Sequence, residues 1–188
     1  MTLRRRRFTS LASAAAAAAV LPLSWPGGVV AAAPSPAPKA PGAGDAPPEP
    51  MGHTIDGELI TAPRPGQAMV LTFWATWCTY CRQELPVLDG IQRVAGPDRL
   101  QVVAVNTEER DVFRKVHRVL KDKLALRLAY DPGQLAQTAW GVHSLPHMVI
   151  IGRDGRIDAI FKGYSDDGLD AIVAAINRAI GATPAAGA

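Results

Sequence analysis

Cysteine is scarce in this sequence, and its scarcity excludes several kinds of site. The chain of 188 residues contains two cysteines, Cys78 and Cys81, and no second Cys-x-x-Cys pair that could complete a structural zinc site. Motifs that bind nucleotides, flavins or phosphates are also missing, so we expect no cofactor and no metal ligands. The chemistry of the chain must therefore be sought at the two cysteines.

The chain also lacks a large excess of either positive or negative side chains. The chain carries 20 basic and 17 acidic side chains. Four of the basic ones are the arginines of residues 4–7, and without them the count is 16 against 17. A nearly neutral chain has no electrostatic reason to bind phosphate backbones or anionic membranes. We therefore expect no nucleic-acid partner.

The first 33 residues have the pattern of an export signal peptide. The arginines at 4–7 form a basic start, residues 11–23 are apolar and rich in Ala, and residues 29–33 offer small side chains for cleavage. The adjacent arginines also resemble a twin-arginine signal, with the Sec type as the other choice. The apolar stretch is shorter than the ~20 residues of a membrane span. We predict cleavage and a periplasmic or extracytoplasmic location, with an uncleaved anchor as the alternative.

Composition divides the remainder of the chain into three parts. Residues 34–50 are rich in Pro and Ala without periodicity, which predicts a solvated linker. Residues 51–181 have the length of one domain. Residues 182–188, again Ala and Gly with a proline, predict a disordered tail.

Apolar periodicity within the predicted domain indicates alternating strands and helices. An Asp-Gly turn predicts an N-terminal β-hairpin over residues 53–61. The alternation of strands and helices along the chain predicts an α/β fold, with a mixed central sheet and helices on both faces. The expected strands cover 69–74, 100–106 and 124–130, and two more flank the turn at 153–155. The expected helices cover 79–95 and 134–140, with one more beginning at 107 or 108 and a last one beginning at 165 or 166.

The two cysteines stand where a buried strand passes into a helix. At positions i and i+3 they share the first helical turn, close enough for a disulfide. The free N–H groups and the dipole of that turn favour a thiolate, and lower the cysteine pKa from its ordinary value of about 8.5. We predict that Cys78, at the exposed start of the turn, attacks a substrate, and that the more buried Cys81 resolves the mixed disulfide. A purely structural disulfide is the alternative, although it would close a very small loop.

The sequence around the pair resembles the thioredoxin superfamily. Residues 73–86 read Phe-Trp-Ala-Thr-Trp-Cys-x-x-Cys-Arg-x-Glu-x-Pro, which is most similar to the TlpA/ResA-like branch with its DsbE/CcmG-like extracytoplasmic members. A second motif, Gly-Val-x-x-Leu-Pro-x-x-Val-Ile-Ile, contains Leu145 and Pro146. The resemblance covers nearly all of residues 51–181 and implies a thioredoxin-like fold.

The resemblance also implies roles for four residues besides the cysteines. Pro146 is expected to follow a cis peptide bond opposite the dithiol, and the backbone of Leu145 to pair with an extended segment of substrate. Trp77 is expected to form an exposed platform beside the pair. Glu84 is expected to act as the acid or base that deprotonates Cys81, although a helix glutamate at such a spacing is more often exposed.

These residues predict a thiol–disulfide oxidoreductase that reduces specific protein disulfides. The resemblance implies substrates of the cytochrome c maturation or copper-site assembly type. An oxidising compartment would trap the pair as a disulfide, so a membrane thiol donor of the DsbD/CcdA kind is expected to reduce it. A peroxidase is disfavoured, because the Pro-x-x-x-Thr-x-x-Cys pattern is missing. The competing class is a copper-binding metallochaperone that adds His143 or His147 to the two sulfurs.

Overall fold

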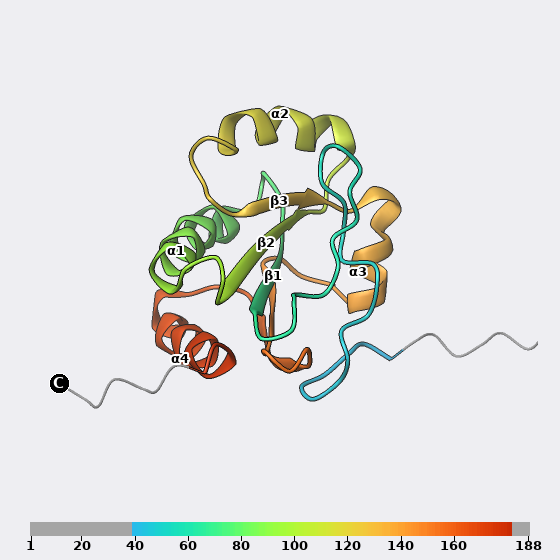
Figure 1. Ribbon diagram of the computed structural model, residues 1–188. Helices are drawn as coiled ribbons and strands as arrows, with labels where there is room; N and C mark the ends of the chain where they lie inside the picture. The colour runs from blue at the N-terminus through green and yellow to red at the C-terminus, as the bar shows by residue number, and fades with distance from the viewer. Residues whose placement is uncertain (1–38, 182–188) are drawn as a thin grey trace, which may run out of the picture. The chain divides into compact units, whose positions relative to one another are not determined.

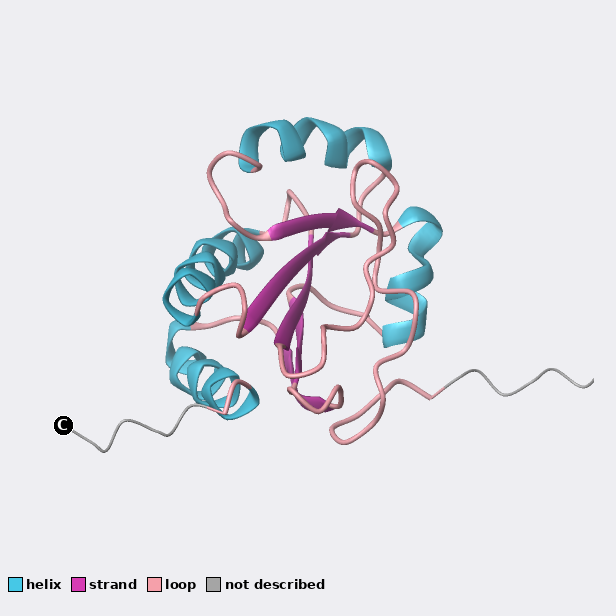
Figure 2. Cartoon of the chain, in the orientation of Figure 1, coloured by secondary structure: helices cyan, strands magenta, loops and turns pink. Residues whose placement is uncertain are grey.

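The structure, a computed structural model, describes residues 39–181, and a mixed sheet forms its centre (Figure 1, Figure 2). The strands are β1 (Ala68–Trp74), β2 (Leu100–Asn106), β3 (Arg127–Tyr130), β4 (His147–Ile151) and β5 (Ile157–Lys162). Their order across the sheet is β3-β2-β1-β4-β5. The first three run parallel, and β4 lies antiparallel to both β1 and β5.

Helices cover both faces of the sheet, which confirms the predicted fold class. α1 and α4 pack through Leu88 and Ile176 on one face, and α3 packs through Trp140 on the other. The helices are α1 (Thr79–Ala95), α2 (Arg110–Leu120), α3 (Leu135–Trp140) and α4 (Leu169–Ala179), with the short 3-10 helices η1 (Pro132–Gln134) and η2 (Asp166–Gly168) directly before the last two.

Strand β1 is buried on both faces and bonded along both edges. All seven of its residues are buried. Its side chains alternate between the faces, so that Val70 and Trp74 join the core under α1 and α4, whereas Leu71 and Phe73 join the core under α3. A run that is apolar at nearly every position is what a strand covered on both sides requires.

The strand register brings both sequence motifs to one edge of the sheet. Trp74 lies opposite Asn106 of β2, and Phe73 lies opposite His147 of β4. The carboxyl end of β1 and the beginning of β4 are therefore neighbours. The cysteine pair follows the first of these ends, and Pro146 precedes the second.

The last residues of the predicted linker are bonded to the domain, which corrects its predicted boundary. The Gly44 N–H donates to the Ile157 carbonyl over 2.7 Å, and the Ile157 N–H donates to the Asp45 carbonyl over 3.0 Å. The indole N–H of Trp140 donates to the Pro50 carbonyl over 3.2 Å. Composition could not reveal these contacts, because they depend on groups that lie about a hundred residues away in the sequence.

The predicted N-terminal hairpin takes the form of isolated bridges. The Gly57 N–H donates to the Thr54 carbonyl and closes the expected turn, and His53 forms a single antiparallel bridge with Leu59. His53 also exchanges two backbone hydrogen bonds of 2.8 Å with Tyr130 at the end of β3. The segment thus extends the β3 edge of the sheet without strands of regular length.

Several predictions fall on residues outside those that the structure describes. They are the export signal at 1–33, the first part of the linker and the tail at 182–188, which stay predictions. Among residues 39–181, every helix is too short or too polar to cross a lipid bilayer.

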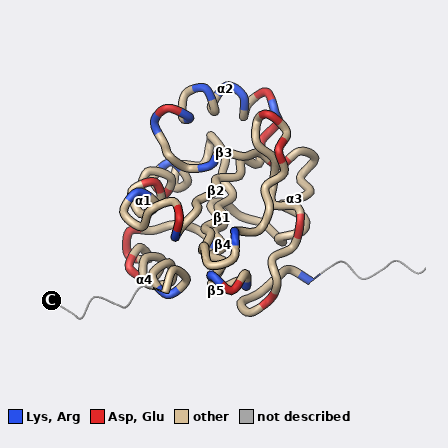
Figure 3. Tube along the Cα trace, viewed as in Figure 1, with Lys and Arg blue, Asp and Glu red and all other residues tan. Residues whose placement is uncertain are grey.

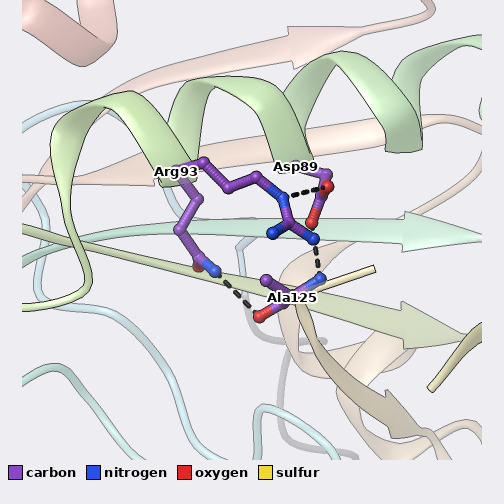
Figure 4. A network of polar contacts seen from close by, with 4 residues as sticks. Asp89, Arg93 and Ala125 are labelled. Carbon is purple, nitrogen blue, oxygen red and sulfur yellow. Dashed lines mark hydrogen bonds and ion pairs between the residues drawn. The ribbon is translucent and has the colours of Figure 1, made fainter. Parts of the chain in front are cut away.

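Buried polar side chains join α1 to the sheet (Figure 4). Asp89 accepts a hydrogen bond from the Ala125 N–H over 2.5 Å and one from the Arg93 side chain over 2.8 Å. Gln92 donates to the Ala125 carbonyl over 2.8 Å and accepts from the Val102 N–H over 2.5 Å. Gln92 therefore gives a partner to the buried Val102 N–H, and both side chains tie α1 to Ala125, an exposed residue just before β3.

Replacing Gln92 by Ala should destabilise the fold. The change leaves the buried Val102 N–H without a partner and exposes the Ala125 carbonyl to water, so we expect the free energy of unfolding to fall by about 1–3 kcal/mol. Urea unfolding of the oxidised chain measures this loss. Gln83→Ala, on the exposed face of the same helix, is the control and should change stability by less than about 0.5 kcal/mol. Equal losses in both variants would contradict the role of Gln92.

Candidate functional site

The two cysteines lie at the start of α1, directly after β1. Cys78 is the N-cap residue of the helix, and its sulfur accepts a hydrogen bond from the Cys81 N–H over 3.2 Å. The Cys78 N–H donates to the Ala75 carbonyl over 3.1 Å and closes the turn between strand and helix. The sulfurs are joined in a disulfide, with their Cα atoms 5.3 Å apart. The predicted strand–turn–helix setting of the pair is confirmed.

Both cysteines are largely buried. The exposed fraction is 6% for Cys78 and 0% for Cys81, so the predicted order of accessibility is right but the exposed position expected for Cys78 is wrong. Both residues belong to the same buried cluster as Trp74 and Leu85. The first turn of α1 contains no acidic residue, so no carboxylate there opposes the attraction of the helix dipole for a thiolate.

Trp77 and Leu145 line the same hollow, which has a volume of about 320 Å³. Trp77 is 69% exposed, as predicted for a platform. The peptide bond between Leu145 and Pro146 is cis, as the sequence comparison with thioredoxins led us to expect. Trp77 precedes Cys78 and Leu145 precedes Pro146 in the chain, so the two sequence motifs lie on either side of one hollow.

Glu84 is buried against the sheet rather than exposed on the helix. Its exposed fraction is 1%, and its Oε1 accepts a hydrogen bond of 2.5 Å from the Thr72 hydroxyl of β1. Oε2 has no hydrogen-bond partner in the described residues. Burial raises the pKa of the Glu84 carboxyl to about 7, against the smaller opposing effect of the Thr72 hydrogen bond. Glu84 can therefore both hold and release a proton near neutral pH.

The raised pKa of Glu84 predicts a dependence of stability on pH. Between about pH 4.5 and pH 7 the folded chain keeps a proton that the unfolded chain has lost, so this carboxyl makes the fold less stable as the pH rises through that window. Glu84→Gln has no carboxyl to titrate at this position and therefore does not lose stability in this way. Relative to the parent, the variant should become more stable by roughly 3 kcal/mol as the pH rises through the window. Urea unfolding at a series of pH values measures it. A difference that is constant with pH would contradict the assigned pKa.

Glu108 holds the turn before Cys78, a role that the sequence analysis missed. Its carboxylate accepts hydrogen bonds from the Thr76 N–H over 2.6 Å and from the Thr76 hydroxyl over 2.9 Å. On the other side of that residue, the Arg82 guanidinium donates to the Thr76 carbonyl over 2.8 Å. Asn106 in turn bonds to both the backbone and the side chain of Glu108. The only signal in the sequence was an acidic residue two positions after a buried strand, which is too common to identify the contact.

Glu108→Gln should loosen the turn that presents Trp77 and Cys78. The carboxylate accepts both Thr76 hydrogen bonds as charge-assisted bonds. In glutamine the Thr76 hydroxyl would have to turn and accept from the NH2 group, and the bond to the Thr76 N–H would lose its charged acceptor. We expect faster hydrogen exchange at the Thr76 amide and a loss of about 1–2 kcal/mol in the free energy of unfolding. The neighbouring exposed residue provides the control variant, Glu109→Gln, in which both quantities should be unchanged. Parent-like exchange at Thr76 in the Glu108 variant would show that the contact does not hold the turn.

The histidines near Pro146 do not assemble with the cysteines. His147 is 2% exposed and packs edge-on against Phe73, whose core cluster is the one on the opposite sheet face from the cysteines. Burial, followed by the charges of Lys162 and His143, lowers the pKa of His147 to about 4. In residues 39–181, no three His, Cys, Asp or Glu side chains are grouped so that they could hold a metal ion. The metallochaperone alternative thus lacks an assembled ligand set in this part of the chain.

Known proteins with similar sequences have names that refer to thiol–disulfide or thioredoxin-like chemistry. The chain is 29% identical over 92 residues to the thiol-disulfide oxidoreductase ResA of Bacillus anthracis, which is 49% of this chain and 53% of that protein. It is 34% identical over 99 residues to the thioredoxin-like protein YneN of Bacillus subtilis, 52% of this chain and 58% of that protein. The matched region therefore spans only about half the length of these curated relatives.

The fold and the family follow from two further comparisons. The exposed lipoprotein thioredoxin of Streptococcus pneumoniae superposes with a TM-score of 0.55 at 28% identity, over 68% of this chain and 96% of that one. The fold is therefore thioredoxin-like, as the sequence motifs led us to expect. A family model described as the AhpC/TSA family matches residues 45–160, more than half of the sequence, and the chain belongs to that family.

Proposed function

We propose that this chain is an exported thiol–disulfide oxidoreductase that works at Cys78 and Cys81. The observation that carries the proposal is the position of the pair, bonded at the first turn of α1 beside an exposed tryptophan and the cis-proline loop. The relatives named as oxidoreductases support it. The missing peroxidase pattern and the dispersed histidines favour it over the other classes considered.

The proposed reaction is a two-step exchange. The Cys78 thiolate attacks one sulfur of a substrate disulfide, forms a mixed disulfide and releases the other substrate sulfur as a thiolate, which takes up a proton. Cys81, deprotonated by Glu84, then attacks the Cys78 sulfur and releases the second substrate sulfur as a thiol. Two electrons pass from the pair to the substrate, and the Cys78–Cys81 disulfide remains.

The direction of electron flow is proposed to be reductive. In an oxidising compartment the pair remains a disulfide unless a donor reduces it. A membrane thiol donor of the DsbD/CcdA kind would therefore have to reduce it after each turnover. The substrates would be specific protein disulfides of the cytochrome c maturation or copper-site assembly type. Trp77, Leu145 and Pro146 would hold the segment around the substrate disulfide, since they flank the hollow beside the pair.

The reduction potential of the pair tests the proposal. The chain is equilibrated in dithiol buffers of known potential, and the free thiols are counted. A strongly reducing value, near or below that of thioredoxin at about −270 mV, supports a dedicated reductase. A value near that of a folding oxidase, about −120 mV, would reverse the proposed electron flow. Stoichiometric Cu(I) binding that needs a histidine, without any disulfide turnover, would select the metallochaperone instead.

Glu84→Gln should slow the second step and leave the first unchanged. The amide cannot accept a proton from the Cys81 thiol, so the mixed disulfide should accumulate and its resolution should slow by about 10²-fold. Rapid quenching with acid, followed by mass measurement of the trapped species, separates the two steps. Gln83→Ala, next to it on the exposed face of the helix, is the control. Resolution at the parent rate would rule out the role of Glu84.

A further inference from the structure

A second hollow, with a volume of about 320 Å³, is lined by residues of α1, of α2 and of the turn after α2. It shares no lining residue with the hollow beside Trp77. Its lining includes Thr76 and Arg82, which flank the two cysteines in the chain, so it lies close to the redox pair without including either sulfur. We call it the α1–α2 groove; its apolar lining is Trp74, Leu85, Pro86, Val116, Leu120 and Leu124.

The groove presents apolar surface that is open to solvent. Leu85 and Trp74 are buried, whereas Val116 and Leu120 are half-buried and Pro86 is exposed. An apolar side chain that entered the groove would remove this surface from water, which is favourable by about 25 cal/mol for each Å² buried. An accessible apolar hollow beside a reactive centre is therefore a surface on which a partner can dock.

The charged groups that line the groove, Arg82 and Lys123, are cations. Arg82 donates to the Thr76 carbonyl and the Thr79 hydroxyl. No carboxylate within residues 39–181 forms an ion pair with either cation. The indole N–H of Trp74 is buried and has no acceptor in the same part of the chain, although a buried tryptophan N–H usually has one. An occupant that brings oxygen acceptors would supply what these groups lack.

Helix α2 and the turn after it carry an excess of positive charge (Figure 3). Residues 110–123 contain six Lys or Arg and two Asp side chains. The basic excess is local, because the chain as a whole is close to neutral once residues 4–7 are set aside. Charge complementarity therefore selects an acidic partner over a basic one.

We propose that the α1–α2 groove docks a segment of the substrate protein that carries an apolar side chain flanked by acidic residues. The segment lies a short distance along the substrate from the disulfide that Cys78 attacks. This inference rests on the proposed function and names the chemistry by which that function selects its substrates. The apolar side chain fills the groove, and the carboxylates pair with Lys123 and Arg82.

Peptide disulfides test the proposal directly. Each peptide carries one cysteine bonded to thionitrobenzoate, a spacer of Gly and Ser of varied length, and one of the sequences Glu-Leu-Glu, Glu-Ser-Glu or Lys-Leu-Lys. When the Cys78 thiolate of the reduced full chain attacks the peptide sulfur, the bond to the label breaks and the coloured thionitrobenzoate leaves. Its release gives kcat/KM for each peptide.

The apolar residue and the charges should each contribute to the rate. At the best spacer length, Glu-Leu-Glu should react about tenfold faster than Glu-Ser-Glu, because the leucine is buried in the groove. It should react about threefold to tenfold faster than Lys-Leu-Lys, and raising NaCl from about 0.02 M to about 0.5 M should reduce that second difference.

Two charge-reversal variants of equal net charge distinguish the effect of a cation in the groove from the effect of the positive charge of α2 in general. Lys123→Glu should slow Glu-Leu-Glu by about threefold and speed Lys-Leu-Lys. Lys115→Glu, an exposed position on α2 outside the groove lining, is the matched control and should change the ratio of the two rates less than Lys123→Glu does, because Lys115 does not line the groove. Both positions are exposed, so neither variant should fail to fold.

The outcomes distinguish this inference from the proposed function. Release of label from every peptide at the same rate would overturn the docking site and leave the redox function standing. No release from any peptide would overturn the redox function and the docking site with it. Self-association of the reduced chain that Lys123→Glu abolishes would assign the groove to a second copy, and the proposal would be wrong.

Discussion

Strand β1 is bonded to β2 on one edge and to β4 on the other, and helices cover both of its faces. Its carboxyl end therefore has a single position relative to its neighbours, and the turn that follows is held between them. The Cys78–Cys81 pair, the Glu108 contact to Thr76 and the loop before β4 all depend on that position. A shift of one residue in the pairing of β1 would turn its side chains to the opposite faces and separate these parts.

Burial of Glu84 is the second constraint on the candidate chemistry. A carboxyl removed from water keeps its proton to a higher pH, and here a single hydrogen bond from Thr72 opposes that effect only in part. Cys81, one helical turn before Glu84 in α1, is also fully buried. Burial acts on His147 as well: it has no hydrogen-bond partner among residues 39–181, and its pKa is lowered, so that it loses its charge for the same physical reason.

The two hollows give the redox pair two kinds of surface. The one beside Trp77 and Leu145 is next to the cis-proline and offers backbone and polar groups. The α1–α2 groove offers apolar side chains and cations. A substrate that used both would be held on either side of its disulfide, so that specificity would come from residues outside the Cys-x-x-Cys motif itself. The exposed fraction of Trp77 and the half-buried state of Val116 leave both surfaces open for contact.

The sequence by itself determined the order of strands and helices, the location of the pair at the start of α1 and the family resemblance, because local periodicity and a short motif carry that information. It also identified Glu84 as a candidate, but its spacing favoured an exposed side chain. Only the tertiary structure decided that Glu84 is buried against Thr72, that Cys78 is largely buried, and that the segment around Gly44 is bonded to Ile157. The Glu108 contact to Thr76 and the α1–α2 groove likewise bring together residues about 30 or more positions apart. Such contacts follow from the packing of helices on the sheet, and no pattern within a short window of sequence specifies them.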